Sequence, residues 1–196
     1  MKRLIIATKN KGKVLEIMDL LKHLDFEVVS LIEAGIHEDI VEDGQSFEEN
    51  ALIKALAIHR LTGSAVLADD SGLEIDFLNY APGIYTARFL GEDATDQKRY
   101  KGVLAMLDGI PEEFRAARFV CAASLVSSNG NMTTRGTLEG MIAYQASGVN
   151  GFGYDPIFWV PEYNKTLADL DSDTKNQISH RAKAFKQIAE RMNNLL

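Results

Sequence analysis

The sequence predicts an α/β fold built on a mixed, twisted sheet that is flanked by helices. Short apolar, β-branched runs such as RLIIAT and FEVVSL alternate with longer stretches of helical spacing. This alternation is typical of parallel strands joined by helical crossovers. Two later strand-like runs are instead joined around Asn129-Gly130, which indicates an antiparallel hairpin. A sheet with both kinds of neighbour is expected.

The first half of the chain should alternate strands and helices. Its expected segments are a strand at 3–8, a helix at 14–24, a strand at 26–31 and an aperiodic loop at 37–45. Ser46 and Glu49 match a capping box, so the next helix should begin there. Gly63 should end it.

The second half is expected to be richer in turns. Its expected segments are strand-like runs at 65–70 and 73–78, a Pro-Gly turn within 80–89, a helix at 93–110, a hairpin at 118–144 and a Gly-rich loop at 147–156. Ser71-Gly72 should interrupt the first pair of runs. Asp169, Asp171 and Asp173 are expected to lie in a solvated loop, because the calcium-loop glycine and glutamate are replaced by Thr174 and His180. An amphipathic helix with Ser179 as N-cap should close the chain.

Composition limits the class of protein. The 196 residues suit a single domain over 1–196, and the 21 basic and 28 acidic residues give a net charge of −7. That charge, without a basic and aromatic surface, argues against a nucleic-acid partner. Cys121 is the single cysteine, so no internal disulfide or cysteine metal cluster can form. With no apolar run long enough to span a bilayer, no membrane role and a cytoplasmic location are expected.

The loop ATKNKGK leads from a strand into a helix. Backbone N–H groups at a helix start can bind phosphate, and Lys9, Lys11 and Lys13 would add positive charge. The pattern is not a Walker A loop, because Gly12-Lys13 is followed by Val14 and the upstream glycine is missing. A simple capped helix start explains the residues at least as well.

Asp69 and Asp70 stand side by side at the end of the apolar run AVLADD. Because strand side chains alternate, both should not face one site unless the chain twists there. Carboxylates here, with Glu42, could hold Mg²⁺, which takes oxygen ligands, and a solvated polar turn fits equally well. Asn50 and Lys54 share a helical face, which matters for this site only if that face borders the carboxylates.

The Gly-rich loop GVNGFGYD has the wrong order of glycines for a dinucleotide fingerprint. A flexible turn would be the ordinary interpretation. Phe152 and Tyr154 nevertheless lie inside this polar loop, and Asp155 follows them. An aromatic ring can stack on a base and a carboxylate can accept from a ring N–H, which favours a base pocket. His180 and Arg181 open the last helix, where such a pair is ordinarily a surface feature. Because their positive charge opposes the helix dipole there, a functional role is more favoured than for a pair elsewhere.

Taken together and in order, five segments resemble the inosine triphosphate/xanthosine triphosphate pyrophosphatase family. They are ATKNKGKVLEI, VEDGQSFEENALIKA, LADDSGLEIDFLNYAPGIYTARF, GFGYDPIF and KNQISHRAKAF, and they span nearly the whole chain. The resemblance implies Mg²⁺-dependent hydrolysis of deaminated purine nucleoside triphosphates (ITP, dITP and XTP) to the monophosphate and pyrophosphate. It also implies two lobes with an active-site cleft between them, and a homodimer.

The resemblance assigns the reaction to two carboxylates. Glu42 and Asp70 would hold Mg²⁺, and Asp70 would orient or deprotonate the attacking water. Ser71 and Lys54 would contact the nucleotide. The phosphate loop would consist of Thr8, Lys9, Asn10, Lys11, Gly12 and Lys13.

The remaining assignments concern the base. Phe152 would stack on it, and His180 with Arg181 would read its edge by donating to the purine six-oxygen. The other nucleotide contacts would come from Gly153, Tyr154, Asp155 and Lys175. Rival interpretations are a related pyrophosphatase of the septum-formation-inhibitor type acting on pyrimidine or modified nucleotides, a nucleotide sensor without turnover, and an RNA-binding module. The SHR segment and the aromatic base wall favour purine, the Glu42/Asp70 pair argues against a sensor, and the net charge of −7 argues against RNA binding.

Overall fold

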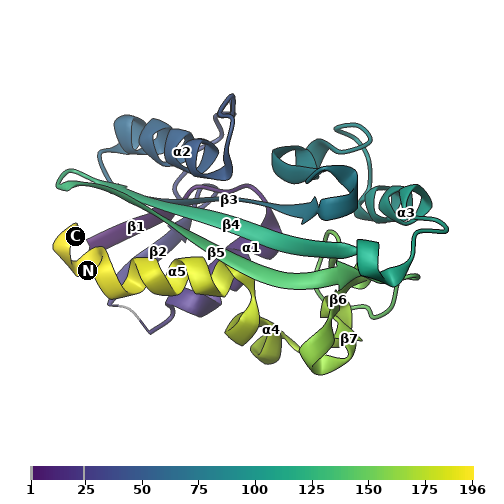
Figure 1. Ribbon diagram of the computed structural model, residues 1–196. Coiled ribbons are helices and arrows are strands. Elements are labelled where there is room, and N and C mark those ends of the chain that lie inside the picture. Colours follow the sequence, from purple (N-terminus) through teal and green to yellow (C-terminus); the bar gives the residue numbers. More distant parts are fainter. Residues whose placement is uncertain (1, 24) are drawn as a thin grey trace. The chain divides into compact units, whose positions relative to one another are not determined.

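The computed structural model describes residues 2–23 and 25–196, and its described strands form one seven-stranded sheet. They are β1 (Lys2–Ile6), β2 (Phe26–Ser30), β3 (Ala65–Ile75), β4 (Ala116–Ser127), β5 (Gly130–Ile142), β6 (Phe158–Val160) and β7 (Lys165–Thr166). Their order is β2-β1-β3-β4-β5-β6-β7. β1 pairs in parallel with β2 and β3, whereas β6 is antiparallel to β5 and β7. The predicted mixed sheet is confirmed (Figure 1).

Five α-helices accompany these strands in the described residues: α1 (Lys11–Leu21), α2 (Phe47–Thr62), α3 (Asp96–Met106), α4 (Ser172–Ile178) and α5 (His180–Arg191). The predicted caps of α2 are confirmed: the Ser46 hydroxyl accepts from the Glu49 N–H, and Gly63 ends the helix in the left-handed conformation. The return half of the capping box differs, because the Glu49 carboxylate accepts from the Gln45 N–H.

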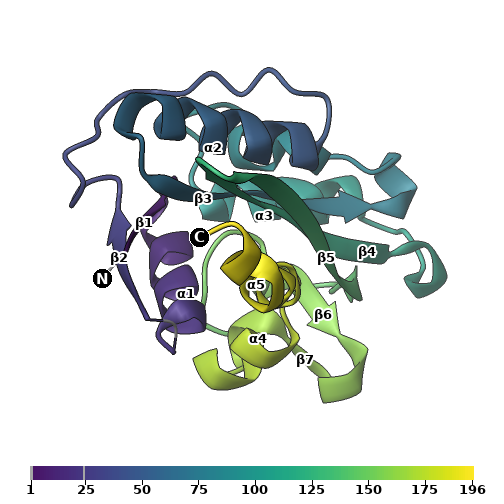
Figure 2. The ribbon, with the colours of Figure 1, turned by 90° about the vertical axis from the view of Figure 1, so that its left-hand side faces the viewer.

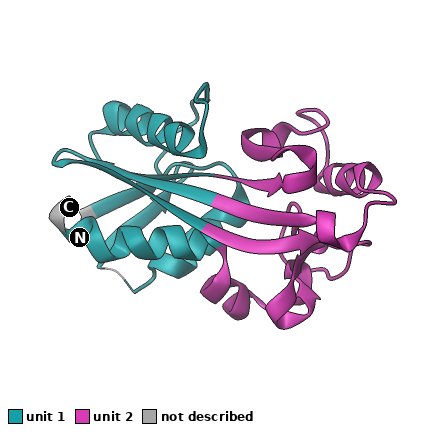
Figure 3. Cartoon of the chain, viewed as in Figure 1, with its two compact units in different colours: residues 1–70, 121–136, 180–196 teal, residues 71–120, 137–179 magenta. Residues whose placement is uncertain are grey.

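The chain divides into two compact units (Figure 3). Unit 1 contains residues 1–70, 121–136 and 180–196, and unit 2 contains residues 71–120 and 137–179. β3, β4 and β5 contribute residues to both units. The assignment of the chain to a single domain stays a prediction.

Unit 1 has an apolar layer on each side of its strands. α1 and α5 lie on one side and α2 lies on the other (Figures 1 and 2). Alternate residues of β1 follow this division: Leu4 and Ile6 join the layer under α1 and α5, whereas Ile5 and Ala7 join the layer under α2. The sheet of unit 1 is thus buried on both faces, as parallel strands require.

Unit 2 has its own core, built around Phe158 and the apolar face of α3. Arg115 is buried there at 2% exposure, and its guanidinium donates to the backbone oxygens of Leu107, Ile142 and Ala143. A buried cation is tolerated because its N–H groups are satisfied by backbone acceptors.

Two predictions about local structure were wrong. Ser71-Gly72 does not interrupt the strand, because β3 runs unbroken from Ala65 to Ile75. Asp171 and Asp173 do not lie in a simple solvated loop, because α4 forms there with Asp171 as its N-cap, accepting from the Thr174 N–H. Leu24, at the end of the expected first helix, lies outside the described residues. No helix of the described chain is long and apolar enough to cross a membrane.

Candidate active site

Asp69 and Asp70 point to opposite faces of β3. Leu67 belongs to the layer under α1 and α5, and Ala68 belongs to the layer under α2. Strand alternation therefore directs Asp69 toward α1 and α5, and Asp70 toward α2. Their contacts agree: Asp69 pairs with Lys13 of α1, and Asp70 accepts a hydrogen bond from Asn50 of α2. The two carboxylates serve two separate clusters.

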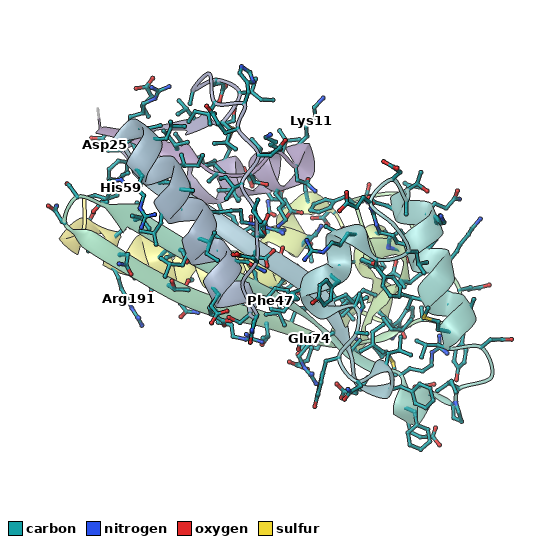
Figure 4. The ribbon with its side chains drawn as sticks, turned by 90° about the horizontal axis from the view of Figure 1, so that it is seen from above. Lys11, Asp25, Phe47, His59, Glu74 and Arg191 are labelled. Carbon is teal, nitrogen blue, oxygen red and sulfur yellow. The ribbon has the colours of Figure 1, made fainter. Side chains whose placement is uncertain are left out.

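The first cluster contains Asp70, Glu42 and two residues of α2. In Figure 4, α2 lies over the strands and runs from the Phe47 label toward the His59 label. The Lys54 ammonium is 2.8 Å from the Glu42 carboxylate and 3.8 Å from that of Asp70. Asn50 donates to Asp70 Oδ2 at 3.1 Å. The face of α2 that carries Asn50 and Lys54 thus borders the carboxylates, as the site required.

Burial sets the proton affinities in this cluster. Burial raises the pKa of the Asp70 carboxyl, and the nearby Glu42 charge adds to the rise, although Lys54 opposes it. For Lys54, burial alone would lower the pKa, but Asp70 and Glu42 outweigh it and the pKa lies above its usual value. The lysine therefore remains a cation between two carboxylates.

The second cluster surrounds Asp69, which has no exposed surface. Asp69 Oδ2 lies 2.9 Å from Lys13 Nζ and 3.4 Å from Arg181 Nη2. Arg181 also pairs with Glu16 of α1. Although burial by itself would raise the pKa of Asp69, Lys13 and Arg181 hold it well below its usual value. Asp69 thus joins the start of α1 to the start of α5.

The predicted phosphate loop forms the capped start of α1. The Asn10 side chain accepts from the Lys13 N–H, and the Asn10 N–H donates to the Thr8 hydroxyl. Lys9 pairs with Asp39 at 2.6 Å in an exposed position. Lys11 is exposed and points away from the ribbon (Figure 4). Gly12 lies in the first turn, where backbone N–H groups favour an anion.

The start of α5 packs tightly on β5. A Cβ at Gly136 would lie 2.6 Å from the Ala184 nitrogen and closer still to the His180 carbonyl oxygen. Thr134 Oγ1 donates to the Ala184 oxygen at 2.9 Å. His180 and Arg181 are both buried there, at 5% and 2% exposure. The position of the predicted base-reading pair is therefore set by close backbone packing.

Unit 2 contains a third cluster from the Gly-rich loop and α4. Lys175 Nζ lies 2.6 Å from Asp155 Oδ2, with both side chains buried, and 4.8 Å from the centroid of the Phe152 ring. Asp155 Oδ2 also accepts from the Phe152 N–H at 2.9 Å. Gly151 adopts φ +74°, and a Cβ there would collide with the Asp155 carboxylate. The cluster presents a half-buried ring beside a paired ammonium, which suits a flat, polar ligand.

The other predicted residues of unit 2 have structural contacts. Tyr154 is buried in the core, and its hydroxyl donates to the Thr86 carbonyl oxygen at 3.1 Å. The Gly153 N–H donates to Asp96 at 2.9 Å. Ser71 follows Asp70 within β3 and is half-buried.

Sequence reasoning did not assign roles to Asn50, Asp69 and Glu16. The helical spacing of Asn50 and Lys54 marked the right face of α2 but could not show its hydrogen-bond partners. Glu16 gave no signal, since a single glutamate on an amphipathic helix is ordinarily exposed. Its partner Arg181 is 165 residues away in the sequence.

The fold is that of an α/β protein. Unit 1 carries a basic helix start and two carboxylates around a cation, and unit 2 carries an aromatic ring beside a paired ammonium. The model of the Ham1 family matches residues 4–191. A dITP/XTP pyrophosphatase of Desulforamulus reducens is 47% identical over 98% of this chain and 96% of its own length. One of Vibrio vulnificus is 49% identical over 96% and 95%.

Solved structures agree. The HAM1 protein from Coxiella burnetii has a TM-score of 0.89 at 40% identity, covering 98% of this chain and 99% of that one. The Ham1 protein of Staphylococcus aureus has a TM-score of 0.88 at 38% identity, with both chains fully covered. The chain belongs to the Ham1 family.

Proposed function

We propose that this chain is a nucleoside-triphosphate pyrophosphatase that hydrolyses ITP, dITP and XTP to the monophosphate and pyrophosphate. Family membership and the dITP/XTP pyrophosphatases at 46–49% identity support the activity and the substrates. The observation that carries the chemistry is the convergence of Glu42 and Asp70 on one cation, the Lys54 ammonium. Two carboxylates that share a cation can hold positive charge beside a polyanionic substrate during its hydrolysis.

Mg²⁺ is the proposed cofactor, and the residues present fit it. Among residues 2–23 and 25–196, no group of three or more Asp, Glu, His or Cys side chains could hold a metal. Mg²⁺, however, is usually bound by one or two carboxylates plus water and substrate phosphates. Glu42 and Asp70 supply two carboxylates that already share a cation. When bound there, Mg²⁺ would neutralise charge on the phosphates.

Asp70 is the proposed base. Water attacks the α-phosphorus, the bond to the bridging oxygen breaks, and pyrophosphate leaves. Asp70 takes the proton from water, as a carboxylate beside the reacting phosphate can do. Lys54, and Lys13 at the start of α1, would offset charge on the phosphates. The remaining phosphate contacts are assigned to the start of α1 and to Ser71.

Base recognition is assigned to two sets of residues. Phe152 would stack on the purine, with Asp155 and Lys175 at its edge. His180 and Arg181 would donate to the six-oxygen of hypoxanthine or xanthine. Against the adenine amino group these donors would be left unpaired, at a cost of ~1–3 kcal/mol. Arg181 would donate in addition to Glu16 and Asp69, which a guanidinium with five N–H groups allows.

The test is product release from ITP, XTP, dITP, ATP and GTP with Mg²⁺, measuring pyrophosphate separately from orthophosphate. Pyrophosphate from the first three alone is the expected result. Orthophosphate would show that a different bond is cleaved. Inactivity on the whole panel, with activity on pyrimidine triphosphates, would favour the septum-formation-inhibitor type of enzyme.

Assembly and location are further proposals. A homodimer and a cytoplasmic location rest on the resemblance and the composition of the sequence. Sedimentation at micromolar concentration should show a species of twice 21.7 kDa. A single species at 21.7 kDa would contradict the dimer.

A further inference from the structure

Asn50 joins the two parts of the carboxylate cluster through both ends of its side-chain amide. Its Oδ1 accepts from the Gly44 N–H at 2.9 Å, and its Nδ2 donates to Asp70 Oδ2 at 3.1 Å. Gly44 is two residues from Glu42 in the loop at 37–45. The amide is therefore tied to the backbone of the loop that carries one carboxylate and to the side chain that forms the other.

The surroundings leave this amide little freedom. Asn50 is 2% exposed and lies one helical turn before Lys54 on the same face of α2. A Cβ at Gly44 would lie 2.7 Å from Asn50 Oδ1 and 2.8 Å from Glu49 Cβ. The absence of a side chain at position 44 is what lets the loop approach the amide. Because Gly44 supplies a donor and Asp70 an acceptor, the two contacts select one orientation of the amide.

We propose that Asn50 is a positioning residue that holds Asp70 and the Glu42 loop at the spacing a divalent cation requires. This inference rests on the proposed function, in which Glu42 and Asp70 share Mg²⁺. Asn50 carries no charge and so adds no ligand charge of its own. It acts by fixing the rotamer of Asp70 and the path of the loop, as partners of metal-binding carboxylates generally do. In this cluster Lys54 provides the positive charge, and Asn50 holds the Asp70 side chain and the loop of Glu42 in position.

The test compares Asn50→Leu with the wild-type chain in two assays. Mn²⁺ binding is measured without nucleotide by electron paramagnetic resonance, and kcat and KM for ITP are measured with Mg²⁺. We expect the Mn²⁺ dissociation constant to rise about 10–100-fold and kcat to fall by a similar factor. The KM for ITP should change less than about threefold, because Asn50 is not assigned to the nucleotide, and excess Mg²⁺ should recover part of kcat.

Two further variants separate positioning from stability. Ile58→Val removes one buried methyl from the same helix, away from the carboxylates, and should lower stability while leaving both readouts within about twofold. Gly44→Ala disturbs the Asn50 amide from the loop side and should weaken Mn²⁺ binding in the same direction as Asn50→Leu. It also keeps the inference testable if Asn50→Leu does not fold.

Several results would overturn the inference. They are an unchanged Mn²⁺ affinity in folded Asn50→Leu, a loss of Mn²⁺ affinity in Ile58→Val equal to that in Asn50→Leu, and no Mn²⁺ binding by the wild-type chain. Failure of the proposed function looks different: the wild-type chain would bind Mn²⁺ but release no pyrophosphate from any triphosphate. The effect of Asn50→Leu on Mn²⁺ binding would still decide the positioning role.

Discussion

Asp69→Asn should cost far more stability than its small change in volume suggests. Asp69 is fully buried, 2.9 Å from Lys13 and 3.4 Å from Arg181. At an effective dielectric constant of about 20, each of these attractions is about 5 kcal/mol. The loss of these attractions is partly offset, because the asparagine avoids the desolvation penalty of a buried carboxylate, which is several kcal/mol.

The net loss depends on where the two cations can go. Lys13 retains 15% side-chain exposure and can turn its ammonium toward water, whereas Arg181 keeps Glu16 as a partner. Removing one partner from a buried ion pair costs about 3–5 kcal/mol. At roughly 2–4 °C per kcal/mol for a chain of this size, the thermal midpoint should fall by about 6–20 °C.

The assay is thermal and denaturant unfolding followed by circular dichroism, with Asp39→Asn as the control. The Lys9–Asp39 pair is shorter, at 2.6 Å, but its side chains are 47% and 95% exposed, so its removal should cost less than about 1 kcal/mol. Equal losses in the two variants would refute the reasoning that burial, and not distance, sets the value of the pair.

The same prediction has a pH signature. The folded-state pKa of Asp69 is lowered, so its contribution to stability is present above its ordinary pKa of 3.8 and is lost as pH falls through the folded value. The difference in unfolding free energy between the wild type and Asp69→Asn should be constant from about pH 5 to pH 8 and shrink below about pH 4. A difference that instead grows in acid would contradict the assignment.

Two other variants test the site from different directions. Asp70→Asn should abolish pyrophosphate release yet raise the thermal midpoint at pH 7. The folded-state pKa of Asp70 is raised, so ionisation of this carboxyl destabilises the fold as pH rises above 3.8. A lower midpoint, or retained turnover, would be evidence against this. Gly136→Ala should lower the free energy of unfolding, measured with denaturant, by about 1–3 kcal/mol, because the new methyl displaces the start of α5. The same displacement should raise the KM for ITP. Unchanged stability would show that the helix start can move freely.

Much of the fold could be predicted because its signals are local. α2 begins where the Ser46 hydroxyl accepts from the Glu49 N–H and ends where the Gly63 N–H donates to the His59 oxygen, and Asn129-Gly130 marks the hairpin. α4 was missed because a seven-residue helix shows little periodicity, and its aspartates are also typical of loops. The continuity of β3 was missed because pairing within the sheet overrides the turn preference of Ser71-Gly72.

The candidate site also had a part that local signals could predict and a part that they could not. Its residue types and their order were visible in the motifs, and strand alternation separated Asp69 from Asp70. Which helix covers which face of β3 was not visible, so Lys13 was assigned to phosphate without its buried partner. The pairing of Arg181 with Glu16 likewise depends on α1 packing beside α5, a contact that no local pattern encodes.

Because Asp69 and Asp70 are adjacent, the register of β3 decides which carboxylate faces which charged cluster. β1 and β3 pair in parallel with Ile6 opposite Leu67, and this register turns Asp69 toward two cations and Asp70 toward Asn50 and Lys54. A slip of one residue would reverse every side chain of the strand, so that each carboxylate would leave its own partners and face the opposite side of the sheet. The two carboxylates are alike in type, yet their pKa values shift in opposite directions, because the cations Lys13 and Arg181 outweigh burial at Asp69 while burial dominates at Asp70. The apolar core that fixes the register of β3 thereby decides which aspartate remains ionised for structure and which can accept a proton.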